Sequence, residues 1–200
     1  MSGSSRLIKS KDRVKDVGEV FTPDFLVEQM LDQFPKDAWI KTKNWLEPTC
    51  GNGQFILGIL HRKLGKHRYN IINALNTTFG CDIMTDNVSE CHVRIYKEIV
   101  LPYAKKHKLT WEAWEELRYE IVCIVETNIK PTKDALTEDF TKWRHFEDRP
   151  QKQQSFMISK VKSIFRFIDE GTIPCTKNKT DLRLFKELST LQVDYQSDFG

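Results

Sequence analysis

The residues best suited to chemistry surround two glycines in the first third of the chain. Residues 46–55 read Leu-Glu-Pro-Thr-Cys-Gly-Asn-Gly-Gln-Phe. Gly51 and Gly53 allow positive φ and let backbone N–H groups approach a bound molecule. The apolar pair Trp45-Leu46 comes before the glycines and apolar residues 56–60 follow them, which predicts a strand, a tight turn and a helix. Such a turn can hold a carboxylate or the edge of a nucleoside, although packing alone also explains many Gly-x-Gly turns.

An acidic residue follows a second predicted strand. Residues 77–83 read Thr-Thr-Phe-Gly-Cys-Asp-Ile and have the β-branched and aromatic content of a strand, with Asp82 at its carboxyl end. Ligands in doubly wound sheets bind beyond this end of the strands, where an acidic side chain can accept two hydrogen bonds from a ribose diol. Alternatively, Asp82 or Asp86 starts the next helix. The spacing of about 30 residues from the glycine turn leaves room for a crossover helix and favours the ribose role.

Two further segments, one before the glycine turn and one after Asp82, belong to the same pattern of motifs. Gly18–Pro23 reads Gly-Glu-Val-Phe-Thr-Pro, and Asn128–Leu136 ends in Lys-Asp-Ala-Leu. Together with the glycine turn and Phe79–Ile83, these segments resemble the S-adenosylmethionine-dependent DNA adenine-N6 methyltransferases of restriction–modification type. The resemblance covers residues 18–136 and implies S-adenosyl-L-methionine as cofactor, DNA as substrate and DNA methylation as activity.

The resemblance also implies roles for individual residues. The Phe-Thr-Pro segment folds over the methionine part of the cofactor in that family, which places Thr22 near its carboxylate. Asp134 would face the exocyclic amine of the adenine, and the backbone at Ala135 would meet the ring edge, although Asp134 could equally cap a turn. The full set of expected cofactor contacts is Thr22, Glu47, Pro48, Thr49, Cys50, Gly51, Gly53, Asp82, Ile83, Asp134 and Ala135.

One signature of that family is missing. Its members carry an Asn/Asp/Ser-Pro-Pro-aromatic loop that binds the flipped-out base. No two of the seven prolines in this chain are adjacent. The catalytic residues are therefore unassigned, and two hypotheses stay open: an active methyltransferase, or a catalytically degenerate binding protein such as an accessory subunit or an anti-restriction or regulatory protein, viral ones included. A Rossmann-type dehydrogenase is disfavoured because the turn lacks a third glycine.

Composition excludes several other classes. Hydrophobic content of 40% and charged content of 30% in 200 residues describe one globular domain with a short appendage, and the net charge of +3 is too mild to identify a nucleic-acid protein. No apolar run suits a membrane span or a signal peptide, so we expect no membrane partner and a cytoplasmic location. Five cysteines without a Cys-x-x-Cys pair predict reduced thiols, and five scattered histidines predict no metal site.

The remaining pattern predicts the positioning elements. Residues 1–17 form a basic N-terminal arm, either mobile or a poorly packed helix that could lie along phosphates. Thr22 should cap a helix over Asp24–Phe34, with Pro23 at its first position and one face in the core: Phe25, Leu26, Met30, Leu31 and Phe34. A first strand is expected at 44–46, a helix from the glycine turn to Leu64 closed by Gly65, and a surface loop at 66–76.

The later part of the chain predicts mostly helices. Residues 86–108 form a long helical segment that Pro102 bends or divides, residues 111–117 repeat at helical spacing, and residues 121–125 suit a buried strand or a helix end. Short helices are expected at 159–168 and 181–191. Residues 142–156 mix aromatic and basic side chains, which could hold single-stranded nucleic acid, although a solvated loop with core anchors is favoured: Lys142, Trp143, Arg144, His145, Phe146, Arg149, Lys152 and Phe156.

These elements predict an α/β protein, a Rossmann-like methyltransferase three-layer sandwich with a largely parallel sheet. The S-adenosylmethionine-binding domain would span residues 18–140. Residues 141–200 would complete the sheet or form a helical appendage. The chain lacks room for a separate recognition domain, so a protein partner could supply target recognition.

Overall fold

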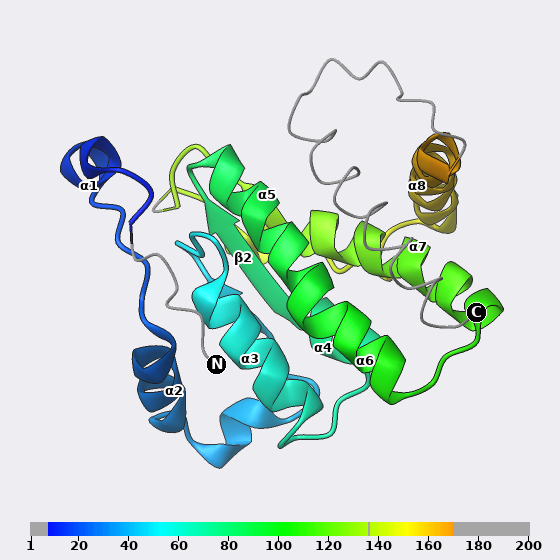
Figure 1. The fold of residues 1–200 in the computed structure, drawn as a ribbon, viewed down its shortest axis with the longest axis horizontal. Helices are drawn as coiled ribbons and strands as arrows, with labels where there is room; N and C mark the ends of the chain where they lie inside the picture. The colour runs from blue at the N-terminus through cyan, green and yellow to red at the C-terminus, as the bar shows by residue number, and fades with distance from the viewer. Residues whose placement is uncertain (1–7, 136, 170–200) are drawn as a thin grey trace.

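Three short parallel strands organise the fold. The computed structural model describes residues 8–135 and 137–169 and shows a mixed α/β arrangement (Figure 1). The strands β1 (Trp45–Glu47), β2 (Thr78–Asp82) and β3 (Ile129–Pro131) pair in the order β1-β2-β3. Glu47 pairs with Gly80 and Asp82 pairs with Pro131. The carboxyl ends of all three strands therefore meet at one edge of this sheet.

Helices surround the central strand β2. Figure 1 shows α3 and α5 in front of β2, and α3, α4, α5 and α7 all contact it. The helical elements are α1 (Lys11–Val17), α2 (Asp24–Asp32), the 3₁₀ helix η1 (Lys36–Trp39), α3 (Gln54–Leu64), α4 (Ile71–Asn76), α5 (Thr85–Arg94), the π-helical turn η2 (Ile95–Val100), α6 (Leu101–Lys106), α7 (Trp111–Asn128), the 3₁₀ helix η3 (Phe140–Lys142) and α8 (Gln151–Asp169).

The long helical segment predicted over 86–108 is confirmed as α5, η2 and α6 in direct succession. The π-helical turn ends at Val100, two residues before Pro102, which has no N–H to donate to the carbonyl of Glu98. The ambiguous residues 121–125 are helical and buried, because they lie within α7 where α4 and α8 pack against it. Residues 181–191 and most of the predicted C-terminal part lie outside the described residues.

The prediction for α2 is wrong in two respects. Thr22 does not cap the helix: the N-cap is Pro23, without a side-chain hydrogen bond. The buried face consists of Val27 and Leu31, whereas four residues expected in the core are exposed: Phe25, Leu26, Met30 and Phe34. Gly58 of α3 explains this rotation, since a Cβ there would lie 2.8 Å from Val27 and 3.0 Å from Leu31. The missing side chain lets α2 approach α3 through these two residues.

The surface loop predicted over 66–76 is also wrong in its second half. Residues 71–76 form α4, and the side chain of Asn70 caps it by accepting a hydrogen bond from the Asn73 N–H at 2.7 Å. Ala74 and Leu75 are buried beneath α7 instead of exposed. Gly65 ends α3 as expected, but with φ −82° instead of the left-handed conformation.

Lys63 is a fully buried lysine that ties α3 to the start of β2. Its Nζ donates to the Thr77 carbonyl at 2.9 Å and to the hydroxyls of Thr77 and Thr78 at 2.7 and 2.8 Å. Burial lowers the pKa of the Lys63 ammonium to about 7. The ammonium therefore loses its proton far more readily in the folded protein than in the unfolded chain.

We predict that Lys63 makes the free energy of unfolding depend on pH. Between pH 7 and its ordinary pKa of 10.5, the unfolded chain binds the extra proton, so stability rises with pH by up to about 1.4 kcal/mol per unit. Urea denaturation across this window measures the free energy of unfolding of the wild type and of Lys63→Met. Both proteins contain the same cysteines, so any contribution of the thiols cancels in the difference. Lys66→Met, an exposed control, should leave the slope unchanged, and an unchanged slope in Lys63→Met would contradict the prediction.

Candidate functional site

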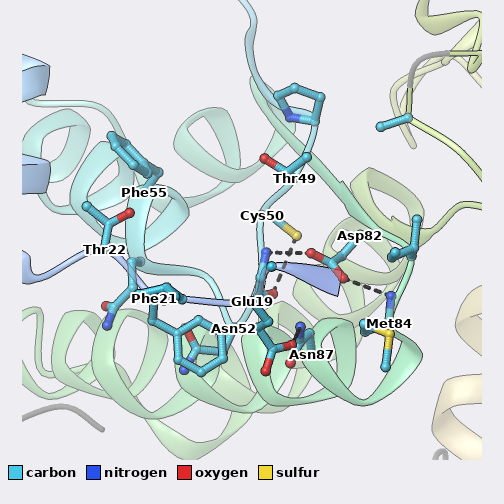
Figure 2. Close-up of a pocket in the computed structure, with 17 residues that line it drawn as sticks. Glu19, Phe21, Thr22, Thr49, Cys50, Asn52, Phe55, Asp82, Met84 and Asn87 are labelled. Atoms are coloured by element: carbon cyan, nitrogen blue, oxygen red, sulfur yellow. Dashed lines mark hydrogen bonds between the residues drawn. The ribbon is translucent and has the colours of Figure 1, made fainter. Parts of the chain in front are cut away.

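A cavity of about 350 Å³ lies at the carboxyl edge of the sheet (Figure 2). Four separate segments line it: the stretch before α2, the turn between β1 and α3, the start of α5, and the loop after β3. The lining residues are Gly18, Glu19, Val20, Phe21, Thr22, Pro48, Thr49, Cys50, Gly51, Asn52, Gln54, Phe55, Asp82, Ile83, Met84, Asn87 and Ala135. This is the edge at which ligands bind in parallel α/β sheets.

The glycine turn adopts the conformation that its sequence predicts. Gly51 has φ +50° and Gly53 has φ +96°, and Gly53 is the N-cap of α3. A Cβ on Gly53 would lie 2.6 Å from the Cys91 Sγ, so the glycine permits α5 to approach the turn. The Cys50 N–H donates to the Cys81 carbonyl at 2.8 Å, which fixes the turn to β2.

Asp82 joins the turn to the start of α5. Its Oδ2 accepts a hydrogen bond from the Gly51 N–H at 2.9 Å, and its Oδ1 accepts one from the Met84 N–H at 2.8 Å. Asp82 is not the N-cap of α5, since that position is Met84. Each carboxylate oxygen retains a second lone pair with which to accept a hydrogen bond from a ligand hydroxyl.

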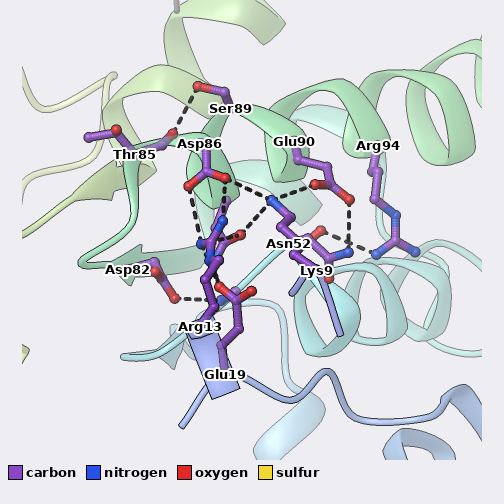
Figure 3. A network of polar contacts seen from close by, with 12 residues as sticks. Lys9, Arg13, Glu19, Asn52, Asp82, Thr85, Asp86, Ser89, Glu90 and Arg94 are labelled. Carbon is purple, nitrogen blue, oxygen red and sulfur yellow. Dashed lines mark hydrogen bonds and ion pairs between the residues drawn. The ribbon is translucent and has the colours of Figure 1, made fainter. Parts of the chain in front are cut away.

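Glu19 also lines the cavity and is held by a charged network (Figure 3). Its side chain is 8% exposed, and its Oε2 accepts hydrogen bonds from Arg13 at 2.5 Å and from the Asn87 amide at 2.7 Å. Arg13 also contacts Asp86 at 2.6 Å, and Lys9 contacts Glu90 at 2.7 Å. These contacts dock α1 onto α5, so two cations of the predicted basic arm are engaged within the protein.

The same network affects Asp86. Burial alone would raise the pKa of this carboxyl, but hydrogen bonds from Arg13 and Lys9 outweigh burial and lower the pKa to about 2. Asp86 therefore stays ionised at all but strongly acidic pH, and the docking of α1 persists across the neutral range.

Three residues that line the cavity carry a buried polar atom that lacks a hydrogen-bond partner within the described part of the chain: Glu19 (Oε1), Asn52 (Oδ1) and Gln54 (Nε2). The opposite atoms of the two amides are fixed, since Asn52 Nδ2 donates to Glu90 at 2.9 Å and Gln54 Oε1 accepts from Arg94 at 3.1 Å. Leaving a buried polar atom unsatisfied costs about 1–3 kcal/mol. A bound polar molecule would relieve this cost.

The lining also includes apolar residues and one thiol. Ile83 is 50% exposed and, with Pro48, Met84 and Ala135, provides a surface for a flat ring. A hydrogen bond with Cys91, together with burial, raises the pKa of the Cys50 thiol. Cys50 is therefore protonated at neutral pH and is not poised as a nucleophile.

The structure gathers most of the residues predicted for the cofactor site. Eight line the cavity: Thr22, Pro48, Thr49, Cys50, Gly51, Asp82, Ile83 and Ala135. Glu47, Gly53 and Asp134 do not. Glu47 accepts hydrogen bonds from the backbone and hydroxyl of Thr49, both at 3.2 Å, and so stabilises the turn. The Asp134 carbonyl accepts from the Thr137 N–H at 3.3 Å in a turn of its own.

Several lining residues were missed by sequence reasoning. Glu19 stands within the Gly-Glu-Val-Phe-Thr-Pro string, and its charge in that string was the available signal. Asn52 and Gln54 flank the second glycine of the turn. No local signal identifies Asn87, which is 1% exposed on α5 and reaches Glu19 only through the tertiary fold.

We predict that Gly53→Ala destabilises the protein much more than Gly18→Ala. Both glycines have positive φ, but a Cβ at Gly18 meets nothing within 4 Å, whereas one at Gly53 collides with Cys91. Strain alone should cost about 1 kcal/mol at Gly18, and strain with displacement of α5 about 3 kcal/mol at Gly53. Urea denaturation measures both losses. Equal losses would show that the close approach of α5 is unimportant.

Two features are absent from residues 8–135 and 137–169. No group of three or more His, Cys, Asp or Glu in these ranges could hold a metal ion, and no helix there combines the length and apolar character needed to cross a membrane. No protein-family model, curated protein or solved structure matches the chain.

Proposed function

We propose that this chain binds S-adenosyl-L-methionine in the cavity between Glu19 and Ile83 and acts as a methyltransferase on DNA. The observation that carries the proposal is the meeting of four segments around one cavity, where three lining residues have buried polar atoms that lack a hydrogen-bond partner within the described residues. The cavity of about 350 Å³ lies within the range of about 300–1,000 Å³ typical of small-molecule sites.

A Rossmann-like, three-layer fold is part of the proposal. Three adjacent parallel strands joined by helical crossovers, in the order β1-β2-β3, correspond to one half of a doubly wound sheet. The position of the cavity beyond the carboxyl ends supports the same assignment.

The lining chemistry suits the parts of the cofactor. The free lone pairs of Asp82 can accept hydrogen bonds from the ribose hydroxyls, and the apolar surface of Ile83 and Met84 suits the adenine. The unpartnered Glu19 Oε1 suits the ammonium group of the methionine part, and Thr22 suits its carboxylate. The residues present therefore fit this cofactor.

When bound, S-adenosyl-L-methionine supplies a methyl group on a positively charged sulfur. The carboxylates of Glu19 and Asp82 favour a cationic ligand, and the turn residues orient it. Methyl transfer depends mainly on alignment with an acceptor lone pair, so the chain need not provide a general base. The resemblance to adenine-N6 methyltransferases supports an exocyclic amine of DNA as the acceptor.

A second candidate function is cofactor binding without turnover. The absence of a Pro-Pro-aromatic loop from the whole sequence favours it, because that loop presents the target base in the family. Such a protein would act as an accessory subunit or as an anti-restriction or regulatory protein. A partner supplying target recognition is compatible with both candidates.

We expect calorimetry to detect binding of S-adenosyl-L-methionine by the wild type. Asp82→Asn removes the charge and one acceptor oxygen, and should weaken binding at least tenfold. Glu19→Gln should weaken it as well by removing the anion beside the ammonium. Asp37→Asn, which exchanges an exposed carboxylate far from the lining, is the matched control. No heat with the wild type, or equal affinity in Asp82→Asn, would exclude the proposed site.

Transfer of tritiated methyl groups to unmodified DNA separates the two functions. Counts in DNA that are lost in Gly51→Arg support the enzyme, since the new side chain at φ +50° would meet Phe21 and obstruct the cavity. Calorimetric binding with no counts in DNA, RNA or protein acceptors would instead support the binding protein.

A further inference from the structure

A second cavity, of about 390 Å³, lies away from the first and shares no lining residue with it. It is bounded by the end of α7, by β3, by the segment after η3 and by the first turn of α8, which packs beside α7 (Figure 1). Its lining residues are Thr127, Lys130, Lys142, Trp143, Arg144, Asp148, Arg149, Pro150 and Gln153.

Positive charge dominates this lining. Four cationic side chains face one carboxylate, that of Asp148. Two of the cations have partners: Lys142 contacts Asp139 at 2.9 Å, and Lys130 lies 3.9 Å from the centre of the Trp143 ring. Among the described residues, Arg144 donates a long hydrogen bond, of 3.4 Å, to the Thr141 carbonyl. The excess charge favours an anionic ligand.

Two of the residues that line this cavity carry a buried polar atom that lacks a hydrogen-bond partner within residues 8–135 and 137–169. These atoms are the Nε of Arg149 and the hydroxyl oxygen of Thr127, and Thr127 as a whole is only 8% exposed. A solvated basic loop would keep such atoms in water. The Arg149 Nε–H can only donate a hydrogen bond, and the Thr127 hydroxyl can donate or accept one, so a ligand with acceptor oxygens can satisfy both.

The start of α8 adds donors of the same kind. This helix has 19 residues and no acidic side chain in its first turn, and Pro150 and Gln153 from its start line the cavity. The first N–H groups of an α-helix lack intrahelical acceptors, and the helix dipole favours an anion beside them. The helix start thus agrees with the unpartnered side chains in pointing to an oxyanion.

We propose that this second cavity binds a phosphate group, held by Arg149, Thr127 and the start of α8. The group can belong to a free phosphate compound or to the backbone of a single-stranded nucleic acid. Lys130 lies against one face of the Trp143 ring, so that face is closed to a stacking base. The inference goes beyond the proposed function and does not rest on cofactor binding or methyl transfer.

The test uses the full chain and two probes at low ionic strength: sodium phosphate, followed by calorimetry, and a short fluorescent single-stranded oligonucleotide, followed by anisotropy. Arg149→Gln should weaken binding about tenfold or more, since it removes a charge-assisted hydrogen bond, and Thr127→Val should weaken it several-fold. Lys152→Gln removes an exposed cation from the same helix turn outside the lining, and should cost much less.

Loss of binding in Arg149→Gln and Thr127→Val with phosphate alone supports a free phosphate compound as the ligand. Loss with both probes supports a nucleic-acid backbone. The proposal is overturned if the wild type binds neither probe, or if Arg149→Gln binds as well as Lys152→Gln. Circular dichroism checks each fold, and if Thr127→Val does not fold, the exchange at the partly exposed Arg149 decides.

Discussion

The hydrogen bonds of one carboxylate hold the first cavity together. Asp82 accepts from the Gly51 N–H and the Met84 N–H, and so fixes the turn after β1 against the residues after β2. This arrangement requires that α5 come close to the turn, which Gly53 permits by having no side chain against Cys91. Asp82 therefore has a structural role whether or not a ligand binds, and its proposed ribose contact would use the lone pairs that the backbone leaves free.

Charged contacts hold the side of the cavity that Glu19 lines. Glu19 lies beside the cavity because Arg13 and Asn87 hold one of its oxygens, while Arg13 is itself held by Asp86. The basic segment before the first motif, which by sequence could have contacted phosphates, thus supplies two cations to the protein's own site. We propose phosphate recognition instead at the second cavity, where Arg149 and Thr127 each carry a buried polar atom without a hydrogen-bond partner among the described residues.

Sequence reasoning succeeded where the signal was local. The glycine turn and the position of Asp82 at a strand end follow from residue type and spacing, and both are confirmed. It failed where a contact between residues far apart in the sequence determines which side chains are buried or line the site. The face of α2 is set by Gly58 on α3, which no periodicity within α2 reveals. Asn87 reaches the site only because α1 and α5 meet, and the unpartnered atoms of both cavities can be recognised only once burial is known.

A crystal structure with S-adenosylhomocysteine, the demethylated form of the proposed cofactor, tests the central claim most directly. We expect the ribose hydroxyls within hydrogen-bond distance of the Asp82 carboxylate and the amino group beside Glu19. Density for the ligand elsewhere, or a cavity closed by the protein's own side chains, would contradict it.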